Sequence, residues 1–290
     1  MKIGFIGIGV MGLSMSTHLL NAGHELFVYN RTKSKADPVV EKGATWCESV
    51  AEVAKVSDVI FTIIGLPQDV EAVYFGDEGL LAHAKAESIL IDMTTSTPDL
   101  AKRIYEAGSQ KGISCLDAPV TGGDVGAKNG TLTIMVGGDE ATFNHVLPLL
   151  DIMGKTIVYM GQAGNGQHTK MVNQIAIAGA ALGMVEALSY ANAFDLNPNT
   201  VLQAITSGSA ASWQLSNMAP RIVAKDFNPG FYIKHFIKDM KIAAHESAEM
   251  DVSLPGLELV LGLYEECQQL DFENLGTQAL YKLYEQKNQK

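Results

Sequence analysis

Lys170 introduces a stretch that is otherwise without charge, because no side chain in residues 175–185 is charged or forms hydrogen bonds. Asn173 follows three residues later and would share a helical face with it. A glycine-rich run, 161–166, precedes the pair and lets backbone or ligand approach closely. A lysine held there has to face a polar group. The alternative is a surface lysine that extends its amine into water.

Three glycines in the spacing GxGxxG follow the first apolar run of the chain. The run KIGFIG covers residues 2–7, and a helical pattern continues over 11–22. In such a strand, turn and helix, the glycines allow a tight turn, the approach of a pyrophosphate and close helix packing. We therefore expect dinucleotide binding here, with a plain glycine-rich turn as the alternative. The expected cofactor-binding residues are Gly7, Ile8, Gly9, Val10, Met11 and Gly12.

The strand expected at 24–30 ends in Asn30, Arg31 and Thr32, where NAD-binding proteins carry an acid. An arginine can form a forked, charge-assisted pair with the 2′-phosphate of NADP. A helix expected to begin here would add a favourable dipole. These residues therefore favour NADPH over NADH. The alternative is that Thr32 caps a helix beside a solvated arginine.

Two further apolar strands are expected at 58–64 and 88–94. Ligands of open parallel sheets bind beyond the carboxyl ends of the strands. The residues that follow these two strands should therefore lie at the same edge as the glycine turn. They are Gly65, Leu66 and Pro67 after the first, and Thr94, Thr95 and Ser96 at the second. An alternative for Thr95 is a helix cap, since Thr97 and Pro98 open the next helix.

A hydroxyl and two glycines, Thr121, Gly122 and Gly123, follow the strand expected at 113–119. Consecutive backbone N–H groups in such a segment suit a carboxylate. A plain turn is the alternative. Asp117 lies in the same strand, and its alternative interpretation is a structural residue whose carboxylate accepts hydrogen bonds from the amides of a turn. Strands at 131–136 and 156–160 complete this half.

The second half is helical throughout, with helices expected at 200–207, 212–223, 231–250, 256–270 and 276–287. The pattern predicts an α/β fold class: a dinucleotide-binding domain with an open parallel sheet at 1–162, then an all-α domain at 163–290. The long helix at 163–193 would join them. Its apolar run is shorter than the roughly 20 residues that a bilayer requires, so we expect a core helix, buried all round. Its apolar surface needs more cover than one small domain gives, which predicts a homodimer or homotetramer.

The chain has 290 residues, of which 47% are hydrophobic and 18% charged, and its net charge is −11. An acidic chain argues against a nucleic-acid partner. The three cysteines are far apart and the histidines form no cluster, so we expect neither disulfides nor a metal site. No export signal is evident, and we expect a cytoplasmic protein.

Five motifs together resemble the β-hydroxyacid dehydrogenases over nearly the whole chain: FIGIGVMG at 5–12, NRT at 30–32, DAPVTGG at 117–123, GNGQHTKMVNQ at 164–174 and FIKDM at 236–240. Within that family, the chain resembles most the NADPH-dependent reductases of glyoxylate and succinic semialdehyde, with 3-hydroxyisobutyrate and tartronate semialdehyde enzymes as close relatives. The resemblance implies a Rossmann domain with a doubly wound sheet, a long interdomain helix and an all-α domain that builds the dimer or tetramer.

The resemblance also implies roles for single residues. Lys170 would be catalytic, Thr121, Gly122 and Gly123 would hold a substrate carboxylate, and Asn173 would orient the substrate. Thr95, Phe231, Lys238 and Asp239 would line the site, with Lys238 near the cofactor. The family more often has serine in place of Thr121, which leaves the substrate preference open. We therefore expect an NADP-dependent reductase of a small aldehyde acid or keto acid; the alternative is a dinucleotide-binding sensor with vestigial activity.

Overall fold

The computed structural model describes residues 1–288. The chain divides into two compact units, Met1–Lys170 and Met171–Lys290. The division falls within the long helix α9 (Asn165–Ala193). Each unit has its own buried core.

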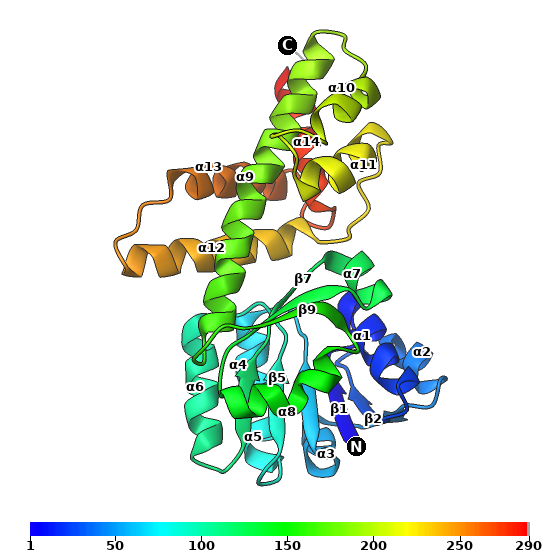
Figure 1. Ribbon diagram of the computed structural model, residues 1–290, viewed down its shortest axis with the longest axis vertical. Coiled ribbons are helices and arrows are strands. Elements are labelled where there is room, and N and C mark those ends of the chain that lie inside the picture. The colour runs from blue at the N-terminus through cyan, green and yellow to red at the C-terminus, as the bar shows by residue number, and fades with distance from the viewer. Residues whose placement is uncertain (289–290) are drawn as a thin grey trace. The chain divides into compact units, whose positions relative to one another are not determined.

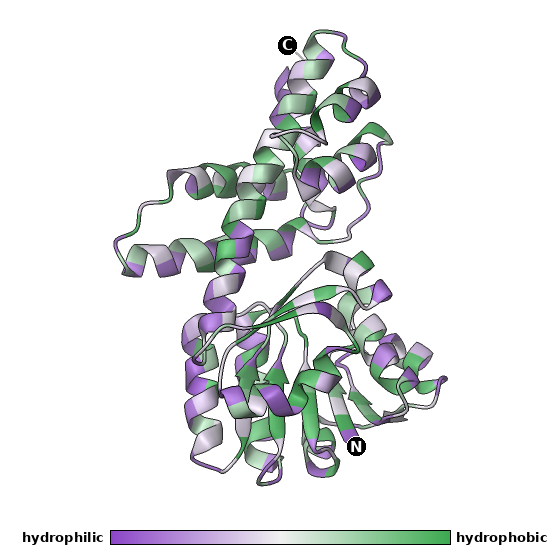
Figure 2. Cartoon of the chain, viewed as in Figure 1, coloured by the Kyte–Doolittle hydropathy of each residue, from purple (hydrophilic) through white to green (hydrophobic). Residues whose placement is uncertain are grey.

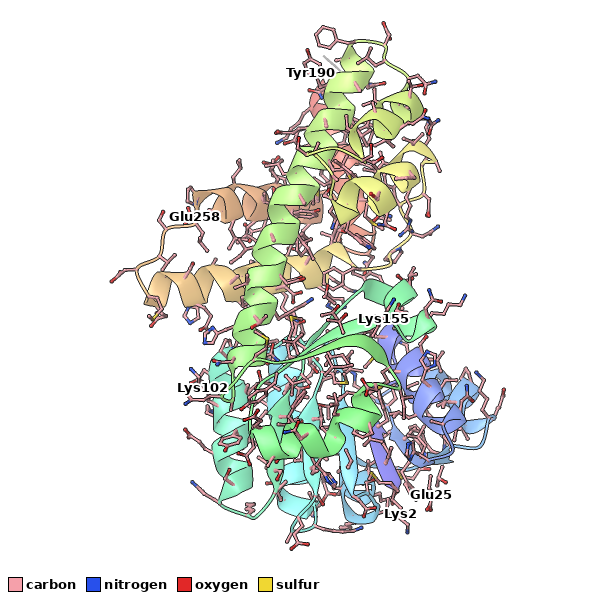
Figure 3. All side chains as sticks on the ribbon, in the orientation of Figure 1. Lys2, Glu25, Lys102, Lys155, Tyr190 and Glu258 are labelled. Carbon is pink, nitrogen blue, oxygen red and sulfur yellow. The ribbon has the colours of Figure 1, made fainter. Side chains whose placement is uncertain are left out.

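A six-stranded parallel sheet in the order β3-β2-β1-β4-β5-β6 forms the centre of the first unit (Figure 1). This order is that of a Rossmann fold and confirms the expected doubly wound sheet. The paired residues Lys2 and Glu25 mark its amino edge (Figure 3). The strands are β1 (Lys2–Ile6), β2 (Glu25–Tyr29), β3 (Thr45–Trp46), β4 (Val59–Thr62), β5 (Ile89–Asp92) and β6 (Ser114–Asp117).

Both faces of this sheet are buried. Successive residues of a strand point to opposite faces, and these strands carry apolar residues at successive positions. Phe61 of β4 belongs to one core cluster and its neighbour Ile60 to the other. Helices α1, α2, α7 and α8 contribute to the first cluster and α3 to α6 to the second. The strands of the sheet are accordingly strongly hydrophobic (Figure 2).

The helices of the first unit follow its strands in the alternating order expected for this fold. Ser49 caps α3 by accepting a hydrogen bond from the backbone N–H of Glu52, and Thr97 caps α6 through that of Leu100. The cap of α6 is thus Thr97 rather than Thr95. The helices are α1 (Val10–Asn21), α2 (Asp37–Val40), α3 (Val50–Val56), α4 (Pro67–Phe75), α5 (Leu80–His83), α6 (Pro98–Ser109), α7 (Gly123–Asn129) and α8 (Glu140–Leu150).

A separate three-stranded sheet completes the first unit. Strand β7 (Val120–Thr121) pairs antiparallel with β8 (Leu132–Val136), and β8 pairs parallel with β9 (Gly154–Tyr159). The last two strands were expected from the sequence; β7 was not. Thr121 therefore lies in a short strand instead of a free turn.

The second unit is helical, as expected. Its core consists of apolar residues from α9, α12, α13 and the short helices around them. A π-helical turn, Gln214–Met218, precedes α11. The other helices are α10 (Pro198–Ile205), α11 (Ala219–Val223), α12 (Ile233–Glu249), α13 (Pro255–Gln269) and α14 (Leu280–Asn288).

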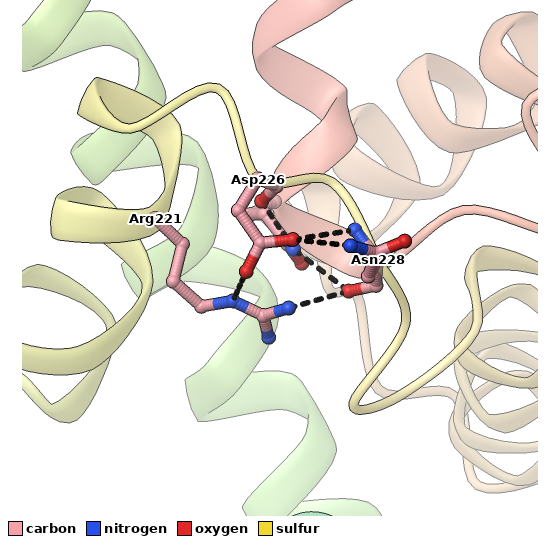
Figure 4. A network of polar contacts seen from close by, with 4 residues as sticks. Arg221, Asp226 and Asn228 are labelled. Carbon is pink, nitrogen blue, oxygen red and sulfur yellow. Dashed lines mark hydrogen bonds and ion pairs between the residues drawn. The ribbon is translucent and has the colours of Figure 1, made fainter.

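A polar network holds the segment between α11 and α12 (Figure 4). Arg221 donates from Nε to Asp226 Oδ2 at 2.9 Å and from its terminal nitrogen to the Asn228 carbonyl at 2.7 Å. Gln278, which is 1% exposed, donates to the carbonyls of Asp226 and Asn228. The pairing with Arg221 lowers the pKa of Asp226. The segment that leads to Phe231 is therefore well ordered.

Helix α9 is not buried all round, which corrects the sequence-based expectation. Ala178, Ala181 and Val185 are buried on one face, whereas Ala176 and Gly183 on another are exposed. The domain of about 120 residues supplies too few helices to enclose it. In the part of the chain that the structure describes, α9 alone is long and apolar enough to cross a membrane by length and composition, a test that core helices of soluble proteins also pass.

Candidate functional site

Four strand ends form one row at the carboxyl edge of the parallel sheet. Ile6 pairs with Thr62, Thr62 with Asp92, and Asp92 with Asp117. The glycine turn, Gly65–Pro67, Thr94–Ser96 and the segment to Gly123 all leave the sheet from this edge. The structure thus brings these predicted segments of the first unit together.

The glycine turn leaves room for a ligand at its middle glycine only. A Cβ on Gly7, whose φ is +101°, would lie 2.1 Å from the Ile63 carbonyl oxygen, and a Cβ on Gly12 would lie 1.9 Å from that of Gly7. A Cβ on Gly9 would meet nothing within 4 Å. Gly9 precedes α1, whose first turn carries no acid. These residues therefore fit the pyrophosphate of a dinucleotide.

Asn30 connects the glycine turn to the end of β2. Its Oδ1 accepts a hydrogen bond from the Ile8 N–H at 2.9 Å, and its Nδ2 donates to the Thr32 carbonyl at 2.7 Å. The Asn30 side chain thus links the backbone of the glycine turn to the segment that follows β2.

Arg31 lies at the end of β2 with 86% of its side chain exposed and forms an ion pair with Asp69 of α4 at 3.4 Å. The helix expected to begin after Thr32 is much shorter than expected, and the Thr32 side chain forms no cap hydrogen bond. Only a three-residue 3₁₀ turn, Lys33–Lys35, and the four-residue α2 follow. Without a longer helix, no substantial dipole supports an anion there, and the exposed guanidinium of Arg31 is a positive group that could meet a 2′-phosphate.

Asp92 is a buried carboxylate beneath the segment that begins at Thr94. Its Oδ1 accepts from Thr62 Oγ1 at 2.7 Å and from the Thr94 N–H at 3.1 Å. Thr94 Oγ1 in turn accepts from the Ile64 N–H at 3.0 Å. Burial, which these hydrogen bonds only partly offset, raises the pKa of Asp92 to about 6. The network joins the segments that follow β4 and β5.

Lys170 is buried with 6% of its surface exposed, which contradicts the alternative of a solvated lysine. Its Nζ donates to the Val120 carbonyl oxygen at 2.9 Å. Val120 directly precedes Thr121, and Gly122 and Gly123 follow with φ of +126° and +63°, a backbone that favours glycine. The ammonium and the segment 121–123 thus lie close to each other.

The first turn of α9 is held by two side chains. Asp117 accepts from the Gly164 N–H at 2.8 Å and from the Gln167 N–H at 2.9 Å. Asp117 is therefore a structural residue, as its alternative interpretation held. The Gln167 amide accepts from the Ser96 N–H at 3.0 Å and donates to the Thr94 carbonyl at 2.7 Å.

In the second unit, a chain of polar contacts joins three of the predicted residues. Asn173 Nδ2 donates to Gln174 Oε1 at 2.7 Å, and Gln174 Nε2 donates to Asp239 Oδ2 at 2.6 Å. Lys238 Nζ lies 3.0 Å from Asp239 Oδ1, and Asp239 is 1% exposed. Phe231 is 36% exposed and stacks on His235.

Three of these residues were missed by sequence reasoning: Asp69, Gln167 and Gln174. Gln167 and Gln174 stand inside the glycine-rich and lysine motif, three residues before and four after Lys170. Their position inside this motif was the only feature of the sequence that pointed to them. Their partners lie 71 and 65 residues away in the chain, respectively.

Comparison with known proteins identifies the family. Residues 2–161 match the NAD binding domain of 6-phosphogluconate dehydrogenase, and residues 164–284 match the NAD-binding region of NADP-dependent 3-hydroxyisobutyrate dehydrogenase. The chain belongs to the β-hydroxyacid dehydrogenase family. It is a hydroxyacid dehydrogenase of the 3-hydroxyisobutyrate dehydrogenase type, with NAD(P)-binding domains.

Relatives of this dehydrogenase match it over nearly full length. It is 54% identical to an uncharacterised oxidoreductase of Bacillus subtilis, covering 97% of this chain and 98% of the relative. It is 46% identical to a probable 3-hydroxyisobutyrate dehydrogenase-like protein of Arabidopsis thaliana, covering 99% and 86%. It is 36% identical to 2-hydroxy-3-oxopropionate reductase of Escherichia coli, covering 98% and 97%.

Two solved structures are similar to this dehydrogenase over nearly its full length. One is 3-hydroxyisobutyrate dehydrogenase of Mycobacterium tuberculosis with L-serine, at 28% identity and a TM-score of 0.88, covering 97% of this chain and 98% of the other. Another is Psf3 in complex with NADP⁺ and 2-OPP, at 25% identity and a TM-score of 0.91, covering 97% and 99%. The sequence-based family assignment is thus confirmed.

Proposed function

We propose that this dehydrogenase is an NADPH-dependent reductase of a small aldehyde acid or keto acid, which it converts reversibly to the hydroxy acid. The observation that carries the proposal is the buried Lys170, whose Nζ lies 2.9 Å from the Val120 carbonyl next to Thr121–Gly123. A buried ammonium beside a segment suited to a carboxylate fits a substrate that carries both a carboxylate and a carbonyl.

In this proposal, Lys170 is the catalytic residue and delivers a proton to the carbonyl oxygen. In the reverse direction, the neutral amine accepts that proton. The backbone N–H groups of Thr121, Gly122 and Gly123 hold the substrate carboxylate. We retain Asn173, Phe231 and Asp239 as proposed substrate-binding residues.

The proposed cofactor residues are those at the carboxyl edge of the sheet, from Gly7 to Gly12, Asn30 to Thr32, Gly65 to Pro67 and Thr95, together with Lys238. When bound, the nicotinamide supplies the hydride for the carbonyl carbon. The open space at Gly9 and the amides of the first turn of α1 would hold the pyrophosphate. Asn30 would keep that turn in place through its contact with the Ile8 N–H.

The preference for NADPH depends on Arg31 in this proposal. We expect Arg31→Ala to remove most of a roughly tenfold to hundredfold preference in kcat/KM, because a charge-assisted pair with the 2′-phosphate is lost. NADH kinetics should change little. Initial rates with each cofactor give the two kcat/KM values.

Asp69 sharpens the cofactor test, because its carboxylate competes with the phosphate for Arg31. Asp69→Asn should therefore raise kcat/KM with NADPH and leave NADH unaffected. Arg103→Ala is the matched control, since Arg103 forms an exposed ion pair with Glu71 at 2.7 Å. Equal use of both cofactors by the wild type, or equal harm to both from Arg31→Ala, would contradict the role of Arg31.

We also propose that the protein forms a homodimer or homotetramer through its second unit. The exposed apolar face of α9 supports this, with small residues that permit close helix crossing. Light scattering at micromolar protein should give at least twice the 31.1 kDa of the chain. A purely monomeric mass would overturn the proposal.

The function itself is tested by oxidation of NADPH with four substrates: glyoxylate, succinic semialdehyde, tartronate semialdehyde and methylmalonate semialdehyde. Turnover of at least one supports a reductase and identifies its substrate. Absence of turnover with all four would contradict it.

A further inference from the structure

The start of α9 is attached to the rest of the first unit by two buried side chains, Asp117 and Gln167, which are 4% and 0% exposed. Gln167 lies on α9 three residues before Lys170, whereas Asp117 lies at the end of β6 and binds the start of the helix. Neither has a part in the proton transfer itself. Their four hydrogen bonds nevertheless determine where this turn of the helix stands.

Asp117 fixes the position of the turn along the helix axis. Its two carboxylate oxygens accept from two N–H groups that point out of the helix start, those of Gly164 and Gln167. The carboxylate is tightly enclosed, because a Cβ on Gly137 would lie 2.6 Å from Oδ1 and one on Gly166 would lie 2.8 Å from Oδ2. The helix start therefore has little freedom to slide.

Gln167 fixes the rotation of the turn. Its side-chain amide both accepts and donates a hydrogen bond: Oε1 accepts from the Ser96 N–H, and Nε2 donates to the Thr94 carbonyl. These partners flank Thr95, a proposed cofactor residue. The first turn of α9 is thus attached directly to the segment that the cofactor is proposed to contact.

Lys170 follows Gln167 by three residues and shares its side of the helix. A rotation or shift of this turn would carry the Lys170 ammonium away from the Val120 carbonyl, to which it donates at 2.9 Å. Proton transfer needs the donor within hydrogen-bond reach, and a displacement of about 1 Å can cost roughly a hundredfold in rate.

We propose that Gln167 is a positioning residue, which with Asp117 sets the place of the Lys170 ammonium relative to the Thr94–Ser96 segment. The inference rests on the proposed function, in which Lys170 is the proton donor. A structural role alone would lower stability without a specific effect on proton transfer.

The test compares Gln167→Met, which removes both amide contacts at similar length, with Gln167→Glu, which keeps the acceptor for Ser96. The matched control is Gln162→Met, because Gln162 is exposed just before the helix. With the best of the four substrates, Gln167→Met should lower kcat by roughly tenfold to a hundredfold and raise the solvent isotope effect on kcat. The KM for NADPH should change less than kcat, because the glycine turn and Arg31 are untouched and Gln167 reaches the cofactor segment only through the backbone of Thr94 and Ser96. Gln167→Glu should lose less.

A double-mutant cycle tests whether Gln167→Met lowers kcat by displacing Lys170. In a Lys170→Ala background, Gln167→Met should lower the remaining kcat by less than about twofold. An equal loss in both backgrounds would overturn the proposal, as would unchanged kcat in folded Gln167→Met. If Gln167→Met does not fold, Gln167→Glu is used in the same cycle with the same criteria.

Failure of this inference and of the proposed function can be told apart. If Lys170→Ala keeps the wild-type kcat, the proposed function fails and the positioning role with it. If Lys170→Ala loses rate but the Gln167 variants do not, only the positioning role is wrong. Amide hydrogen exchange adds a readout without turnover: residues 164–170 should exchange faster in Gln167→Met than in Gln162→Met, and equal exchange would contradict the attachment.

Discussion

Replacement of Lys170 by alanine should lower kcat by roughly 10² to 10⁴, which is the usual contribution of a positioned acid or base and corresponds to about 3 to 5 kcal/mol. The physical reason is that the buried ammonium is the proton source next to Thr121–Gly123. NADPH affinity should change little, because the glycine turn and Arg31 are unaltered. Steady-state rates and NADPH titration by fluorescence measure the two quantities.

Lys155→Ala is the matched control, since Lys155 is an exposed lysine on β9 of the same unit (Figure 3). It should retain the wild-type kcat. Near-wild-type kcat in Lys170→Ala would show that Lys170 does not donate the proton. A defect confined to NADPH binding would make it a cofactor-positioning residue instead.

Relative to wild type, the free energy of unfolding of Asp92→Asn should rise by about 3 kcal/mol between pH 4 and neutral pH. Burial raises the pKa of Asp92 from 3.8 to about 6, and each pKa unit corresponds to about 1.4 kcal/mol. Between these values the folded state binds more protons than the unfolded state, so the free energy of unfolding falls as pH rises from about 4 to 6. Asparagine removes the charge and keeps an oxygen for Thr62 and the Thr94 N–H.

Urea unfolding from pH 4 to 8 tests this prediction. The difference in unfolding free energy between Asp92→Asn and wild type should grow with pH up to about 6 and then remain constant. Asp117, the other carboxyl that faces Asp92, is present in both proteins, and its raised pKa affects both in the same direction. Asp58→Asn, at an exposed aspartate paired with Lys85, is the control. A pH-independent difference for Asp92→Asn would contradict the raised pKa.

The sequence predicted the fold because its determinants are local. Apolar runs at 2–7 and 58–64 became β1 and β4, and the glycine spacing correctly marked the turn before α1. The second half was predicted as helical for the same reason, since its helical patterning is local and prolines mark the starts of α10 and α13. Local pattern singled out the glycine turn, Lys170 and Thr121–Gly123, and the family motifs then implied their roles in one reaction.

Properties that depend on distant contacts were not predictable. The attachment of Gln167 to Thr94 and Ser96 spans more than 70 residues, and the pair of Arg31 with Asp69 spans 38. The burial of α9 was overestimated, because composition shows that a helix is apolar but not how many neighbours cover it. The length of the helix expected after Thr32 was overestimated for a similar reason, because a favourable start signal does not determine helix length.

The central claim is that this dehydrogenase reduces a small aldehyde acid or keto acid with NADPH and uses Lys170 as the proton donor. The most direct measurement is the rate of NADPH oxidation with glyoxylate, succinic semialdehyde, tartronate semialdehyde and methylmalonate semialdehyde, for wild type and Lys170→Ala side by side. The account predicts turnover of at least one substrate by the wild type and a loss of roughly a hundredfold or more in the variant. Absence of turnover with all four, or equal rates for the two proteins, would contradict it.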